Sequence, residues 1–183
     1  SGFNNRTTRQ VARNLVQGLR EAHQQTGQKA KGIILDLRGN PGGLLKQAVN
    51  VSDLFLVDGR IISTRGRHPA SDHDYDARGT DLADGLPLVV LINGRSASAS
   101  EIVSGCLQDL GRAVVLGEQT FGKGSVQAIR EFSNGSALKY TTSKYLTPGN
   151  ISIQSVGVAP HIELQPYFVT QDHVRITPEK RNN

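Results

Sequence analysis

The hydrophobic positions of this chain first follow the period of a helix. Near the N-terminus, apolar residues recur at spacings of three and four, which predicts an amphipathic helix. The residues of this stripe are Val11, Leu15, Leu19 and Ala22. Thr7 or Thr8 can cap the helix, and Gly27 can end it.

Farther along, helix patterns alternate with strand patterns. Two more helices are predicted, one over 44–55 and one between the small-residue turn 94–100 and Gly111. Short apolar runs predict buried strands over 32–37, 60–64, 87–93 and 113–117. Two later stretches, 125–130 and 137–146, are predicted to be extended. A turn is predicted after them, at 148–150. This alternation implies βαβ crossovers and a mostly parallel sheet, with a β-rich C-terminal portion.

The length of the chain favours one folded unit. At 183 residues it is close to the size of a single domain, so we expect one core over 1–183. Residues 66–86 hold few large apolar groups and are predicted to form a polar surface loop, and a tail is expected from about 167 to 183. Because the sequence contains no methionine, we interpret it as a processed product or an excised domain.

Composition and charge exclude several classes of protein. A single cysteine permits no internal disulfide and no cysteine-rich metal framework. No apolar run approaches the ~20 residues of a membrane span. The net charge of +5 comes from 21 basic and 16 acidic residues, and only nine residues are aromatic. The basic residues are scattered rather than clustered with aromatics, so we expect no nucleic-acid partner.

Chemistry is expected in the loops that follow the strands, because open α/β sheets gather their sites at the carboxyl ends of strands. Those loops cover 38–43, 94–100 and 118–124. Ser96, Ser98 and Ser100 lie between a strand and a helix, where free N–H groups can stabilise an oxyanion. The alternative is that Ser96 caps the helix and the small residues only allow close packing.

A nucleophilic serine needs a base, and no histidine has the context of a triad base. The five histidines are His23, His68, His73, His161 and His173. A lysine can serve where desolvation lowers its pKa. Lys123 is the candidate, because Phe121, Gly122 and Gly124 flank it without an adjoining carboxylate. A surface loop lysine is the alternative interpretation.

The sequence favours neither a phosphate-binding loop nor a metal site. Residues 117–123 fit part of a phosphate-binding loop, but Gly124 stands where that loop needs Ser or Thr. The acidic and histidine residues of the 66–86 loop match no defined metal site; they are His68, Asp72, His73, Asp74 and Asp76. No cofactor and no metal are therefore expected.

Three sequence blocks together resemble those of the C-terminal processing (tail-specific) proteases, which are serine peptidases with a Ser–Lys dyad. They are 34–44 (ILDLRGNPGGL), 91–102 (LINGRSASASEI) and 117–127 (GEQTFGKGSVQ). The likeness runs in order from about residue 6 to 166. It implies a crotonase- or ClpP-like α/β core, which agrees with the predicted alternation.

The resemblance assigns roles to individual residues. Ser98 matches the nucleophile, Lys123 the general base, and Gln127 the glutamine that orients the lysine. The backbone amides of Gly43 and Ala99 match the oxyanion hole. The choice of Ser98 over its two neighbouring serines rests on the family motif alone.

The resemblance also implies a biological setting. Members of the family usually carry a PDZ domain, which nothing in this chain resembles, so the chain is expected to be an isolated catalytic core. Protein or peptide substrates cleaved near their C-termini and an extracytoplasmic, for example periplasmic, location are implied as well. Two alternatives stay open: an inactive binding or scaffold domain with the protease fold, and a crotonase-like acyl-CoA enzyme.

Overall fold

The computed structural model describes residues 2–79, 81–164, 167–169 and 176–178. The helices are α1 (Thr7–Thr26), α2 (Leu45–Asp53), α3 (Ala99–Asp109) and the short 3₁₀ helix η1 (Pro69–Ser71). The strands are β1 (Ile33–Asp36), β2 (Arg60–Gly66), β3 (His73–Asp76), β4 (Leu88–Ile92), β5 (Val114–Gly117), β6 (Ser125–Glu131), β7 (Ala137–Leu146), β8 (Ile162–Glu163), β9 (Tyr167–Val169) and β10 (Ile176–Pro178).

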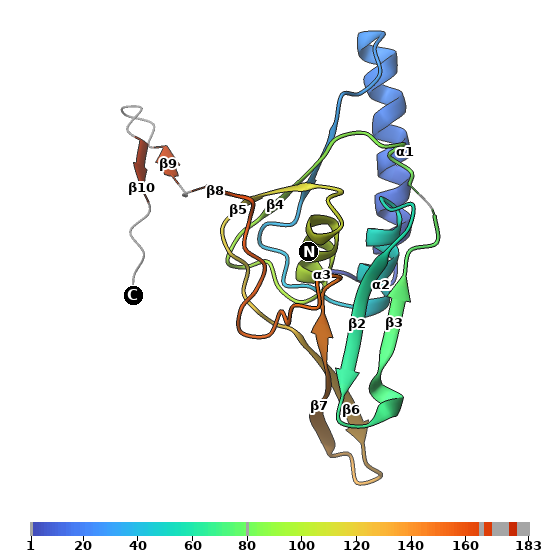
Figure 1. Ribbon diagram of the computed structural model, residues 1–183, viewed down its shortest axis with the longest axis vertical. Helices are drawn as coiled ribbons and strands as arrows, with labels where there is room; N and C mark the ends of the chain where they lie inside the picture. The colour runs from blue at the N-terminus through green and yellow to red at the C-terminus, as the bar shows by residue number, and fades with distance from the viewer. Residues whose placement is uncertain (1, 80, 165–166, 170–175, 179–183) are drawn as a thin grey trace.

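A parallel sheet with the order β1-β4-β5-β8 carries the loops of the predicted site (Figure 1). Leu35 pairs with Val90, and Val90 pairs with Val115. Alternate residues of β4 are buried, as expected for a strand with one face against helices. The α/β fold class and the βαβ units predicted from the sequence are confirmed.

A second sheet is antiparallel, with the order β3-β2-β7-β6. Its β6–β7 hairpin extends away from the rest of the chain (Figure 1). Farther on, β9 and β10 form an antiparallel pair within the region predicted as a tail. The β-rich C-terminal portion expected from the sequence is therefore present.

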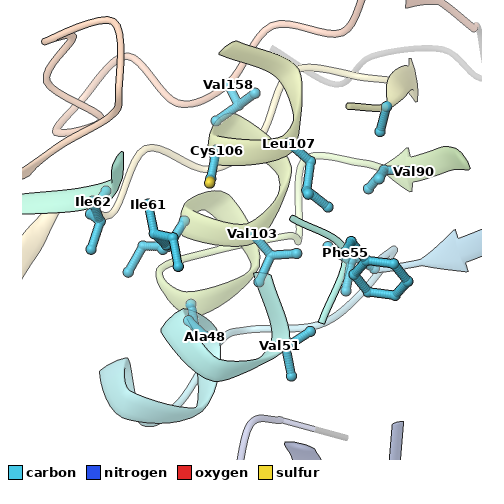
Figure 2. Close-up of a cluster of buried hydrophobic side chains, with 14 of the residues drawn as sticks. Ala48, Val51, Phe55, Ile61, Ile62, Val90, Val103, Cys106, Leu107 and Val158 are labelled. Carbon is cyan, nitrogen blue, oxygen red and sulfur yellow. The ribbon is translucent and has the colours of Figure 1, made fainter. Parts of the chain in front are cut away.

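One apolar cluster joins the two sheets to the helices (Figure 2). Its fully buried side chains include Val51 of α2, Ile62 of β2, Val90 of β4 and Leu107 of α3. Helices α2 and α3 pack against each other, and this fixes the start of α3 relative to both sheets. The predicted nucleophile lies at that start.

Helix α1 forms where the apolar stripe predicted it and ends at Gly27, which adopts a left-handed conformation. Its N-cap is Arg6, and neither threonine caps it. Thr8 instead bonds through its hydroxyl to the Gln47 side chain on α2, at 2.7 Å. Of the helices that the structure describes, none has the length and apolar character needed to cross a membrane.

The predicted polar loop over 66–86 contains two elements that the sequence did not reveal. They are η1 and β3, and β3 is an edge strand paired with β2. Its sequence is polar, and only Tyr75 is half-buried, so it lacks the apolar alternation on which strand prediction relies. Asp74 bonds to Arg60 and Arg65 of β2, and these ion pairs replace apolar packing along the edge.

The single cysteine should not react with thiol reagents while the protein is folded. Burial raises the pKa of the Cys106 thiol to about 12, and the side chain has no exposed surface. Because the thiolate is the reactive form, a thiol-reactive disulfide reagent at pH 8 should label Cys106 only as fast as the chain unfolds. The measurement is the labelling rate in buffer against the rate in denaturant.

The same pKa shift predicts a loss of stability at alkaline pH. The folded state disfavours the thiolate, so its contribution is complete below the unfolded value near 9 and is lost as the pH rises above it. A Cys106→Ala variant is the control, because it should show a weaker decline. In the labelling experiment, rapid reaction of Cys106 in native buffer would contradict its buried position.

Candidate active site

The loops after β1 and β4 are tied to each other by main-chain and side-chain hydrogen bonds. The carbonyl of Asn40 accepts from the Ala97 amide and from the Ser100 hydroxyl, each at 3.0 Å. The Gly39 amide donates to the Asn93 side chain at 2.9 Å. These contacts hold the glycine-rich loop 38–43 against the residues that precede α3.

The three candidate serines occupy different environments. Ser96 is fully buried, and its hydroxyl donates to the Leu37 carbonyl at 2.8 Å. Ser100 is also fully buried, with its hydroxyl engaged by Asn40. Ser98 is half-buried and lies at the N-terminus of α3 with φ 54° and ψ −111°. Such a backbone conformation is strained for serine and is typical of functional sites.

Two main-chain N–H groups lie beside Ser98 without acceptors. Among the described residues, neither the Gly43 amide nor the Ala99 amide donates a hydrogen bond to another group of the protein. A Cβ on Gly42 would lie 2.7 Å from the Ser98 Cβ and 2.8 Å from the Ala99 nitrogen, so only glycine allows this close approach. The glycine-rich loop thus packs against the start of α3, and each of the two segments carries one free donor of the kind that an oxyanion hole needs.

Glu101 connects the start of α3 at Ser98 to the loop that carries Lys123. It is fully buried in the first turn of α3, and its carboxylate accepts four hydrogen bonds. Oε2 accepts from the amides of Ser98 at 2.7 Å and Lys123 at 2.9 Å. Oε1 accepts from the Gly122 amide and the Thr120 hydroxyl, both at 2.6 Å. One carboxylate therefore fixes the main chain at both positions of the predicted dyad.

The sequence interpretation did not assign any role to Glu101. A signal for it was present, because Ser98 and Glu101 have the spacing of a capping box at a helix start. That pattern indicates a bond from Glu101 to the Ser98 amide. It carries no information on the contacts with 120–123, which come from a different loop.

The side chains predicted to form and support the general base are exposed to solvent. Lys123 and Gln127 are exposed, and Phe121, expected to give the lysine an apolar setting, is 68% exposed. Among the described hydrogen bonds, none joins the Lys123 ammonium to Ser98 or to Gln127. The structure thus brings Gly43, Ser98, Ala99 and the Lys123 main chain together, but it does not place the lysine head group on the serine.

The geometry of the lysine loop does not fit a phosphate site. The Gly122 and Lys123 amides, which a phosphate would need, are occupied by Glu101. The segment that follows is the strand β6 rather than a helix. As for metals, no group of three or more histidine, cysteine or acidic residues in the described part of the chain could hold an ion.

A match to a known protein family covers all three loops. A model of peptidase family S41 matches residues 1–164. The chain belongs to peptidase family S41. The carboxy-terminal-processing protease of Bartonella bacilliformis is 54% identical over 137 residues, which cover 75% of this chain and 32% of that protein. The carboxyl-terminal-processing protease of Synechocystis is 44% identical over 138 residues, with the same two coverages.

Two solved structures share the fold. The photosystem II D1 C-terminal processing protease is 33% identical, with a TM-score of 0.78 over 94% of this chain and 42% of that one. Mature CPAF is 16% identical with a TM-score of 0.63, a likeness of fold alone. The chain spans about a third of the length of the curated S41 relatives it matches. The family predicted from the three sequence blocks is confirmed.

Proposed function

We propose that this chain is the catalytic core of a serine endopeptidase that cleaves proteins near their C-termini. The observation that carries the proposal is Ser98, a strained, half-buried serine beside the free amides of Gly43 and Ala99. Family membership and the names of the relatives support the choice of a processing peptidase.

In the proposed reaction, the Ser98 hydroxyl attacks the carbonyl carbon of the scissile peptide bond. Neutral Lys123 accepts the hydroxyl proton, and the carbonyl oxygen becomes an oxyanion held by the amides of Gly43 and Ala99. The C–N bond then breaks, the lysine returns the proton to the leaving amine, and an acyl-enzyme remains for water to hydrolyse. Gln127 would orient the lysine, and no cofactor takes part.

The substrates and the location that we propose are those implied by the resemblance to the processing proteases. The substrates would be proteins or peptides, and a PDZ domain outside this chain would bind their C-termini. We propose an extracytoplasmic location. The names of two relatives place them in chloroplasts.

The structure gives a reason to expect that the chain alone reacts slowly. The amides of Gly43 and Ala99 are free to accept the proposed role, whereas the Lys123 side chain is exposed and makes no hydrogen bond to Ser98 among the described residues. An acid–base residue must reach its target within about 3 Å, directly or through one water. The isolated chain should unfold cooperatively on heating yet cleave an unfolded protein at least about 100-fold more slowly than the full-length protein.

Cleavage products and labelling test the proposed function. The full-length protein should release short C-terminal fragments from an unfolded substrate, identified by mass spectrometry. A fluorophosphonate should add to Ser98 and to no other serine. Cleavage without any adduct on Ser98, or an adduct on Ser96 or Ser100, would contradict the assignment. Equal rates for the chain and the full-length protein would show that the core is self-sufficient.

The pH dependence separates a lysine base from a histidine base. The cleavage rate should rise towards alkaline pH, because a lysine accepts a proton only in its neutral form. A histidine base would instead give a limb near pH ~6.5. The rate profile of the full-length protein is compared with that of a His161→Gln variant as control. A limb near that value, abolished by replacing any of the histidines, would contradict a lysine base.

A further inference from the structure

The segment before α1 pairs with the glycine-rich loop of the site. The Phe3 amide donates to the Gly42 carbonyl at 2.8 Å, and the Leu44 amide donates to the Phe3 carbonyl at 3.0 Å. Phe3 and Gly43 thereby form a parallel β-bridge. The two bonds enclose Gly43, whose own amide is one of the two predicted oxyanion donors.

The contact between the two segments leaves no room for side chains. A Cβ on Gly43 would collide with the Phe3 carbonyl oxygen, and a Cβ on Gly2 would lie 2.5 Å from the Gly42 carbonyl oxygen. The Phe3 side chain is only 5% exposed and belongs to the core cluster. The pairing segment is therefore anchored in the core at the residue that makes both bonds.

We propose that Gly2 and Phe3 form a positioning strand that sets the oxyanion hole. In an extended chain, successive amides face opposite edges. Because the Gly42 carbonyl and the Leu44 amide are turned towards Phe3, the amide of Gly43 is turned away from it. The pairing thus presents the Gly43 N–H at the edge of the loop that packs on Ser98. This inference rests on the proposed function, since it needs a reaction that develops an oxyanion.

The two donors of the hole are held by different means. The Ala99 amide begins a helix that Glu101 fastens to Ser98. The loop carrying Gly43 is tied to the residues before α3 through Gly39 and Asn40, and next to Gly43 itself it has the Phe3 pairing and one bond from the Gly42 amide to the Asn40 side chain, at 3.0 Å. Because Glu101 holds the start of α3 without Phe3, loss of the pairing would act first on the Gly43 donor. A displacement of about 1 Å in such a group lowers a reaction rate by about 10²-fold.

Gly2→Ala is the variant that tests this role with the least damage to the core. The new Cβ meets the Gly42 carbonyl oxygen and must push the two segments apart. Gly18→Ala is the matched control, because Gly18 lies on α1 with open space around it. As a second pair, Phe3→Leu keeps an apolar anchor, whereas Phe3→Ala removes it.

Two measurements are made on each variant. Hydrogen exchange of the Leu44 amide in this chain reports the pairing without any need for activity. Fluorophosphonate labelling of Ser98 in the full-length protein reports the oxyanion hole. Gly2→Ala and Phe3→Ala should speed Leu44 exchange at least about tenfold and slow labelling about 10- to 100-fold. In these two variants the maximal labelling rate should fall, while the half-saturating reagent concentration and the pH profile stay unchanged. The control variants Gly18→Ala and Phe3→Leu should resemble the parent in both measurements.

The experiment distinguishes a failure of the positioning role from a failure of the proposed function. Fast Leu44 exchange in the parent, or normal labelling in Gly2→Ala despite fast exchange, would overturn the positioning role and leave the proposed function intact. A Gly2→Ala variant with unchanged exchange and unchanged labelling would also overturn it. A parent whose Leu44 amide is protected but whose Ser98 never reacts would overturn the proposed function, and the inference with it.

Discussion

Ser98→Ala and Lys123→Ala should each abolish cleavage of an unfolded protein by the full-length protein. We expect each loss to be at least about 10⁴-fold in kcat, because a nucleophile and its base act as one unit. The double variant should be little worse than either single variant. The measurement is the initial rate of substrate cleavage, with circular dichroism to show that each variant is folded.

Two surface variants serve as controls for this pair. Ser136→Ala and Lys139→Ala alter the same residue types on the β6–β7 hairpin, and both positions are exposed. Both variants should keep the parent rate. If Lys123→Ala kept most of that rate, the dyad would be wrong, and losses that added up in the double variant would mean that the two residues act independently.

Glu101→Gln should impair both stability and catalysis. The carboxylate accepts from three amides and a hydroxyl, all donors, and a glutamine side chain offers only one oxygen. Its NH₂ group would face two of these donors and leave them unpaired in the interior. We expect a loss of about 2–4 kcal/mol in the free energy of unfolding, read from urea denaturation.

The catalytic effect of the same substitution should exceed what unfolding explains. At a temperature where the variant is fully folded, the rate of Ser98 labelling should still fall at least about tenfold, because the main chain at both dyad positions loses its common anchor. Glu131→Gln on the exposed hairpin is the matched control and should change neither quantity. A Glu101→Gln protein with parent labelling and parent stability would show that the four bonds are not needed.

Glu101 also explains how the two halves of the site differ. Its carboxylate holds the main chain of Lys123 but not the flexible side chain beyond it. The proposed nucleophile and oxyanion donors are one short side chain and two main-chain amides, and these are fixed by the backbone of the described chain. The base half needs a long side chain to be packed, and its neighbour Phe121 is in solvent.

The limits of sequence prediction are clear at particular residues. The sequence predicts the helix that ends at Gly27, because a glycine after an amphipathic stripe is a local stop signal. It does not predict strand β3, because the side chains of this strand are polar and ion pairs with β2 hold it. Only the family motif singles out Ser98 in the sequence, whereas in the structure the bonds of Ser96 and Ser100 to main-chain carbonyls set those two serines apart.

The alternation of strands and helices, the α/β class and the family can all be predicted from the sequence, because they depend on periodicity and on short contiguous motifs. Which groups share the site cannot be predicted in this way, because it depends on the packing of distant segments. The Glu101 carboxylate meets amides some 20 residues away, and Phe3 pairs with a loop 40 residues later. Such contacts depend on how the elements pack around one core, and a single sequence carries no local pattern that reports which distant main-chain groups will be brought together.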